Sequence, residues 1–137
     1  MPSSETDGEV PGQTLATVAE TLYLANLLLV PGVAFAGLLW LYWRHAGSAP
    51  PLARCHLRNT MSASLWAGVL LVVANAVIIA LGGYDAPYTW MVVVLYFTTA
   101  HSTLVLFGIL GVAKAGAGKM YRYPLVGRPC PECVLIE

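Results

Sequence analysis

Three long apolar runs constrain the fold of this chain more than any other feature of its sequence. They cover residues 19–43, 60–81 and 88–113. Each is close to the ~20 residues that an α-helix needs to cross ~30 Å of hydrocarbon. Three strands cannot close a barrel, and unpaired backbone groups are costly in lipid, so helices are the expected form. The pattern predicts an all-α integral membrane protein, a bundle of three transmembrane helices.

The composition indicates that lipid is the main solvent of the chain. Of the 137 residues, 58% are hydrophobic and 10% are charged, whereas a soluble domain carries about 25% charged residues. The formal net charge is zero, which gives no support for a nucleic-acid partner. We therefore expect the chain to contact the lipid bilayer, together with other membrane subunits or further copies of itself, and not nucleic acid.

The distribution of charge predicts an orientation. Three crossings would place the connection between the first two runs on the same side as the segment after the third run. These two regions contain all seven basic residues, which are Arg44, Arg54, Arg58, Lys114, Lys119, Arg122 and Arg128. Five of the seven acids would lie on the other side, namely Glu5, Asp7, Glu9, Glu20 and Asp85. The positive-inside rule then predicts an outer N-terminus and an inner C-terminus.

This orientation divides the chain into three parts. The expected parts are a polar, acidic outer tail over residues 1–18, a transmembrane domain over residues 19–113 and a cytoplasmic tail over residues 114–137. The expected location is the bacterial cytoplasmic (inner) membrane, with several passes.

Polar side chains inside the runs are the first candidates for a site, because burying them in a membrane is costly. Asn26 and Asn75 are predicted to lie at similar depth and to hydrogen-bond between helices. His101 lies near the midpoint of the third run, inside the polar stretch 98–103. A histidine at that depth needs an internal partner, a metal, a haem iron or a wet cavity. A structural role, a haem or quinone contact and a proton or transport role all remain open.

Cys130 and Cys133 form a C-x-x-C pair, which is one half of a metal knuckle. Cys55 and His56 are expected on the same side of the membrane, so a site of three cysteines and one histidine is geometrically feasible. A pair that binds no cofactor and a redox dithiol are the alternatives.

The segment after the third run is predicted to anchor the chain at the membrane surface. Tyr121 and Tyr123 flank Arg122, and amphipathic side chains of this kind favour the headgroup layer. Pro124 follows at once and prevents a helix from continuing across the segment.

Two short motifs resemble a family. The first is Cys55-His56-Leu57-Arg58-Asn59 at the start of the second run, and the second is Tyr121-Arg122-Tyr123-Pro124-Leu125, preceded by an Ala- and Gly-rich segment. Together they resemble a group of small bacterial membrane proteins of unknown function that is distantly related to the chloroplast inner-envelope import component Tic-twenty. The resemblance covers roughly residues 22–126 and implies a three-helix layout with an inner C-terminal tail. It implies no activity.

The sequence contains no nucleophile motif, phosphate-binding loop or paired carboxylates in or beside the runs, and this argues against an enzyme. We expect a non-enzymatic accessory or assembly subunit of a larger bacterial membrane complex, such as a respiratory or photosynthetic one. A first alternative is a cofactor-bearing membrane protein, with haem or quinone at His101 or a metal at Cys130 and Cys133. A second is a small transporter or translocation component, by analogy with the chloroplast relative. The sequence identifies no particular cofactor.

Overall fold

The computed structural model describes residues 8–130, and these residues form helices and loops without a β-strand. The expected all-α class is confirmed. Helices α4, η1 and α5 follow one another without interruption, and η1 is a π-helical segment between two α-helical ones. The elements are α1 (Gln13–Leu28), α2 (Val33–His45), α3 (Pro51–Ala80), α4 (Thr89–Leu95), η1 (Tyr96–His101) and α5 (Ser102–Gly116).

The first apolar run forms two helices and not one. Pro31 cannot donate a backbone hydrogen bond, and Gly32 takes a φ of 87° that favours glycine. The chain therefore reverses direction between α1 and α2. These helices have 16 and 13 residues, or about 24 and 20 Å at 1.5 Å per residue, which is less than the ~30 Å of hydrocarbon.

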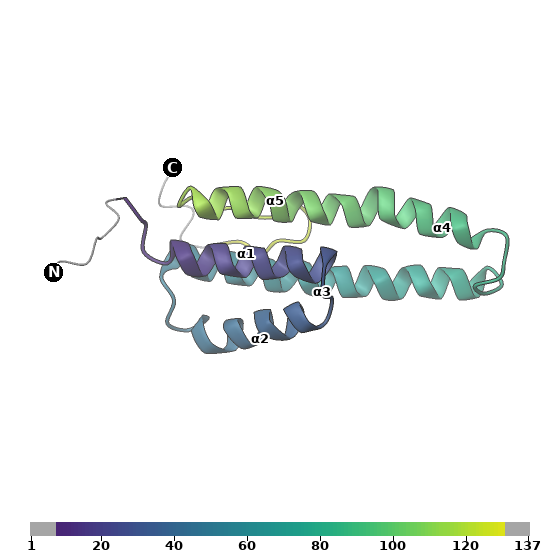
Figure 1. Ribbon diagram of the computed structural model, residues 1–137, viewed down its shortest axis with the longest axis horizontal. Coiled ribbons are helices and arrows are strands. Elements are labelled where there is room, and N and C mark those ends of the chain that lie inside the picture. Colours follow the sequence, from purple (N-terminus) through teal and green to yellow (C-terminus); the bar gives the residue numbers. More distant parts are fainter. Residues whose placement is uncertain (1–7, 131–137) are drawn as a thin grey trace.

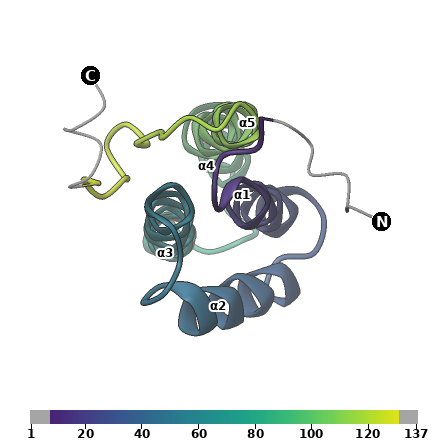
Figure 2. The same ribbon diagram turned by 90° about the vertical axis from the view of Figure 1, so that its left-hand side faces the viewer.

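The expectation of a single crossing helix over residues 19–43 is thus wrong. Within the described part of the chain, two helices are long and apolar enough to cross a membrane, namely Pro51–Ala80 and Thr89–Gly116. The α1–α2 hairpin packs beside the first half of α3, and α1 lies among α5, α3 and α2 (Figures 1 and 2).

The turn at the tip of the hairpin pairs its backbone groups within the chain. Leu29 is 77% exposed although it is apolar. The side-chain oxygen of Asn26 accepts a hydrogen bond from the backbone N–H of Gly32 at 3.1 Å, and the N–H groups of residues 29 and 30 donate to the carbonyl of Ala25. Pro31 has no N–H to satisfy. Non-helical backbone at membrane depth requires this kind of internal pairing.

Both ends of the described chain lie at one end of the molecule. The amide of Gln13, at the start of α1, donates to the carbonyl of Gly116, at the end of α5, at 2.6 Å. Figure 1 shows the loop between α4 and α3 at the opposite end. This arrangement differs from the expected outer N-terminus and inner C-terminus, because a hairpin returns the chain to the side from which it entered.

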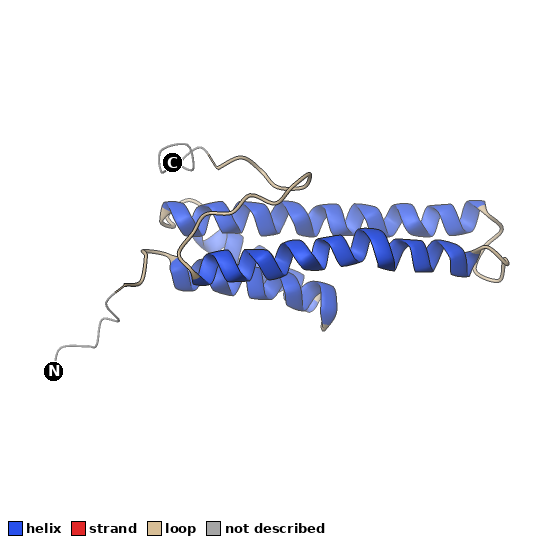
Figure 3. Ribbon diagram, turned by 90° about the horizontal axis from the view of Figure 1, so that it is seen from above, coloured by secondary structure: helices blue, strands red, loops and turns tan. Residues whose placement is uncertain are grey.

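The residues after α5 turn back along α3 and do not form a free tail. Helix α5 ends near Gly118, whose φ of 67° is left-handed. Residues 117–130, here called the strap, then run beside the first half of α3 (Figure 3). Because of the hairpin and the strap, residues 55–64 of α3 are buried except Arg58, while most residues from 65 onwards are exposed.

Cysteine labelling tests the hairpin topology. In a chain with its native cysteines replaced by serine, Glu9→Cys and Lys119→Cys should react with a membrane-impermeant maleimide from one side of the membrane, and Asp85→Cys only from the other. Three crossings would instead give Glu9→Cys and Asp85→Cys the same accessibility, and that result would contradict the hairpin.

Candidate functional site

A buried acid–base pair joins α1 to α3. Nδ1 of His56 lies 2.5 Å from Oε1 of Glu20, and neither side chain is exposed to solvent. Nε2 of His56 lies 3.0 Å from the carbonyl oxygen of Lys119 in the strap. Because a carbonyl only accepts, Nε2 must carry a proton and donate it.

The remaining proton of the pair has two possible positions. Either Nδ1 of His56 donates to the Glu20 carboxylate, or a protonated Glu20 donates to Nδ1. Both forms leave the pair without net charge, which is the condition for burying such groups at tolerable cost. Burial raises the pKa of the Glu20 carboxyl, while the hydrogen bonds from His56 and Tyr123 lower it.

Tyr123 completes the pair from the strap. Its hydroxyl donates to the second carboxylate oxygen of Glu20, and its ring is fully buried. Burial and the nearby Glu20 carboxylate raise the Tyr123 pKa above its ordinary value, so the phenol stays protonated and remains a donor. The ring of Tyr23 in α1 lies 5.5 Å from the Tyr123 ring between centroids, and its hydroxyl donates to the carbonyl of Leu104 at 3.0 Å.

One face of α3 forms hydrogen bonds with several positions of the strap. Beyond His56, the side-chain oxygen of Asn59 accepts from the backbone N–H of Tyr123 at 3.4 Å, and Ser62 donates to the carbonyl of Val126 at 2.7 Å. These α3 residues follow one another at intervals of three positions, so neighbouring ones lie on the same side of the helix. We call Glu20, His56, Asn59 and Tyr123 the clasp.

Two glycines allow the close contacts of the clasp. A Cβ atom at Gly111 of α5 would lie 2.1 Å from a carboxylate oxygen of Glu20, and one at Gly127 would lie 2.4 Å from the side-chain oxygen of Asn59. Both distances are far shorter than van der Waals contact. A larger residue at either position would therefore displace a member of the clasp.

The clasp joins residues from the two short sequence motifs. His56 and Asn59 belong to the first motif and Tyr123 to the second, and the structure brings them together around Glu20. The sequence did not identify Glu20 as a site residue. It was counted only among the acidic residues expected on the outer side of the membrane. The signal that could have identified it is its position as the single acid inside the first apolar run.

In the structure, Cys55, Cys130 and His56 make contacts other than those of the expected metal site. Cys55 forms a disulfide with Cys130, and both ring nitrogens of His56 are engaged in the clasp. Cys133 lies outside the described residues. Within residues 8–130, no group of three or more His, Cys, Asp or Glu side chains is placed to hold a metal ion.

The anchor residues are divided between surface and core. Arg122 is exposed and Tyr121 is partly buried, but Tyr123 is fully buried and cannot serve as a surface anchor. The reason is that its hydroxyl reaches Glu20 inside the bundle, where a donor is needed.

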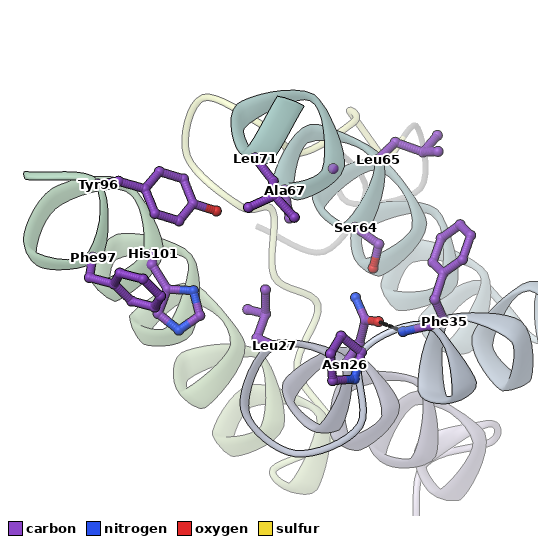
Figure 4. Close-up of a pocket in the computed structure, with 13 residues that line it drawn as sticks. Asn26, Leu27, Phe35, Ser64, Leu65, Ala67, Leu71, Tyr96, Phe97 and His101 are labelled. Atoms are coloured by element: carbon purple, nitrogen blue, oxygen red, sulfur yellow. Dashed lines mark hydrogen bonds between the residues drawn. The ribbon is translucent and has the colours of Figure 1, made fainter. Parts of the chain in front are cut away.

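His101 lines a cavity at the tip of the hairpin. The cavity has a volume of about 520 Å³ and lies between α3, η1 and the tip. Figure 4 shows Tyr96 and His101 on η1, with His101 beside Phe97, and Ser64 on α3. The rings of His101 and Phe97 are 5.0 Å apart between centroids. His45 ends α2 and His56 lies near the start of α3, so no second histidine of the described chain is level with His101.

Asn26 and Asn75 do not contact each other in the structure. Asn26 holds the hairpin tip through Gly32. Asn75 accepts a hydrogen bond from the hydroxyl of Tyr84 and donates to the carbonyl of Leu71. The expected contact between helices required a continuous first helix, and the reversal at the tip removes that condition.

The site thus has a closed part and an open part. The clasp contains acid and base groups, but it is sealed from solvent, so its chemistry can fix the strap and the hairpin to α3 and cannot reach a substrate. The cavity is open and is lined by hydrogen-bonding groups as well as apolar side chains, so it can receive a small molecule.

Comparison with known proteins identifies a family. The model of the magnetosome magnetite crystal formation protein family, MamF/MmsF, matches residues 12–129. This match overturns the resemblance to the group related to Tic-twenty, because it names a different family. No curated protein and no solved structure matches the chain.

A pair of tyrosine substitutions tests the clasp. Tyr123→Phe keeps the ring but removes the donor to Glu20, and it should lower the unfolding free energy in detergent by ~1.5–3 kcal/mol. Tyr121→Phe is the matched control, since its ring lies at the edge of the same cluster, and we expect a change within about 0.5 kcal/mol. Equal effects of the two substitutions would contradict the role of Tyr123.

Alkylation tests the disulfide. In the purified, air-exposed chain, reduction under denaturing conditions should raise the number of alkylated cysteines by two, and peptide mapping should assign both to Cys55 and Cys130. If both cysteines are alkylated without prior reduction, the disulfide is absent.

Proposed function

This chain belongs to the magnetosome magnetite crystal formation protein family, and we propose that it is a non-enzymatic accessory subunit of a magnetosome membrane assembly that acts on crystal growth. The family match covers residues 12–129, which include the hairpin, both long helices and all but the last residue of the strap. This match is the single observation that carries the proposal. The family is one of small membrane proteins involved in magnetite crystal formation.

The buried clasp supports a role without catalysis. The acid and base groups best placed to transfer protons, Glu20 and His56, are fully buried and already paired. General acid–base catalysis needs such groups within hydrogen-bond reach of a substrate. In this chain they hold the strap, and their chemistry stabilises the fold.

The uncovered half of the two long helices supports association with other membrane proteins. The hairpin covers only the first half of α3, and the second half carries exposed apolar side chains such as Val72 (69% exposed) and Ile79 (64%). In a membrane this distal half faces either lipid or partner helices. We infer that partner subunits of the magnetosome membrane pack there.

A photo-crosslinking experiment tests the association. In magnetosome membranes, a photoreactive amino acid at Val72 should give a discrete protein adduct, while the same amino acid at Leu29 of the hairpin tip serves as the control and should give mainly lipid adducts. Lipid adducts alone at both positions would contradict the accessory-subunit proposal.

Deletion tests the role in crystal formation. Cells that lack the chain should still form magnetosome vesicles but produce magnetite crystals of altered size, as measured by electron microscopy, and the wild-type chain should restore them. Unchanged crystals in the deletion strain, or the loss of vesicles together with crystals, would contradict the proposal.

A further inference from the structure

We propose that the cavity at the hairpin tip binds a membrane-soluble quinone. The cavity lies at the middle of the two long helices: Ser64 and Leu71 line it from the centre of α3, and His101 lines it from the end of η1. It opens at a depth that only molecules dissolved in the bilayer can reach. This inference concerns a ligand site and is independent of the accessory role proposed above.

The first observation is a buried hydroxyl without a partner. Ser64 is 5% exposed, and its oxygen has no hydrogen-bond partner in the described chain. Figure 4 shows this hydroxyl pointing into the cavity, toward the side-chain nitrogen of Asn26. An unsatisfied buried polar group costs free energy comparable to a lost hydrogen bond, so the position favours a ligand that accepts a hydrogen bond.

The second observation is the convergence of further hydrogen-bonding groups on the same space. The hydroxyl of Tyr96 points across the cavity toward α3 (Figure 4). Asn26 uses its oxygen to hold Gly32, which leaves its amide nitrogen as a donor. The His101 ring adds a group that can donate or accept. Three elements thus direct polar atoms to one cavity at mid-depth, where such atoms are costly unless they are paired.

The third observation is the π-helical segment itself. Residues 96–101 form a wider turn, which places both Tyr96 and His101 at the cavity. The hydroxyls of Thr98, Thr99 and Ser102 pair with carbonyls of their own helix. The polar stretch is therefore satisfied internally except at the cavity. Single π-helical turns inside α-helices frequently mark functional sites.

The lining selects the chemistry of the ligand. No Asp, Glu, Lys or Arg lines the cavity, and most of its lining residues are apolar, so the cavity favours a ligand that is neutral and mainly apolar. Phe97 and His101 present ring surfaces on which a planar ring can stack. The donors Ser64, Tyr96 and Asn26 call for acceptor oxygens, which an acyl chain lacks. A quinone head group is planar and neutral and carries two carbonyl acceptors, and its tail keeps it in the bilayer.

Competition labelling of the full chain in nanodiscs tests the proposal. A photoreactive azido-benzoquinone with a decyl tail should label peptides that contain residues 26–35, 64–71 or 96–101. Decylubiquinone should protect them saturably, whereas decylbenzene, which lacks the carbonyls, should not. Tyr96→Phe and Ser64→Ala should each raise the half-protecting concentration ~5-fold, the effect of one hydrogen bond.

Two further variants keep the test independent of folding defects. Tyr84→Phe removes a phenol hydroxyl in the loop at the far end, and it should leave protection unchanged. Gly68→Leu adds a side chain where a Cβ meets no atom within 4 Å, and it should fill the cavity and abolish labelling without loss of helix content. Equal protection by decylbenzene, or no effect of Tyr96→Phe and Gly68→Leu, would show that the cavity holds lipid chains and would overturn the proposal.

Discussion

The pair formed by Glu20 and His56 is the interaction on which the rest of the structure depends. It joins α1, which is too short to cross a bilayer, to α3, which is long enough, across 36 positions of sequence. Through Lys119 and Tyr123 the pair also fixes the strap to both helices. Each member would be an uncompensated buried polar group without the others. The hairpin and the strap are therefore held in position together, and loss of one contact weakens the attachment of both.

The clasp, which lies at one end of the molecule, determines where the hairpin tip lies along α3. Because the hairpin is fixed beside the first half of α3, its tip ends level with residues 64–71 of α3 and with η1. The tip closes one side of the cavity that Ser64, Tyr96 and His101 line. Beyond the tip, no third helix of the described chain packs against the two long helices. The uncovered distal half and the cavity are both consequences of a first helix pair that is too short to cross.

The sequence predicts the class of the fold better than its topology. Apolar runs give the all-α class and the two long helices, because the length needed to cross a membrane can be read from composition. The break at Pro31 and Gly32 was visible in the sequence, but a proline in a helix permits either a kink or a reversal. The choice between them depends on tertiary contacts, in particular on Asn26 at the tip and Glu20 in the clasp.

The candidate site, too, could be predicted from the sequence only in part. His101 could be identified from the sequence as a polar residue at mid-depth, and His56 and Tyr123 as parts of short motifs. Their partners could not be identified, since Glu20 is 36 positions from His56 and 103 from Tyr123. The disulfide between Cys55 and Cys130 closes a separation of 75 residues, and no spacing rule distinguishes this pairing from one that uses Cys133.

A double-mutant cycle on the clasp tests its central role most directly. Unfolding free energies in detergent would be compared for Glu20→Ala, His56→Ala and the double variant, with Glu20→Ala combined with the distant Tyr84→Phe as the control pair. The direct hydrogen bond between Glu20 and His56 predicts that the double variant loses at least ~1 kcal/mol less than the sum of the single losses. The control pair should be additive. Additivity of Glu20→Ala and His56→Ala within ~0.5 kcal/mol would contradict the clasp.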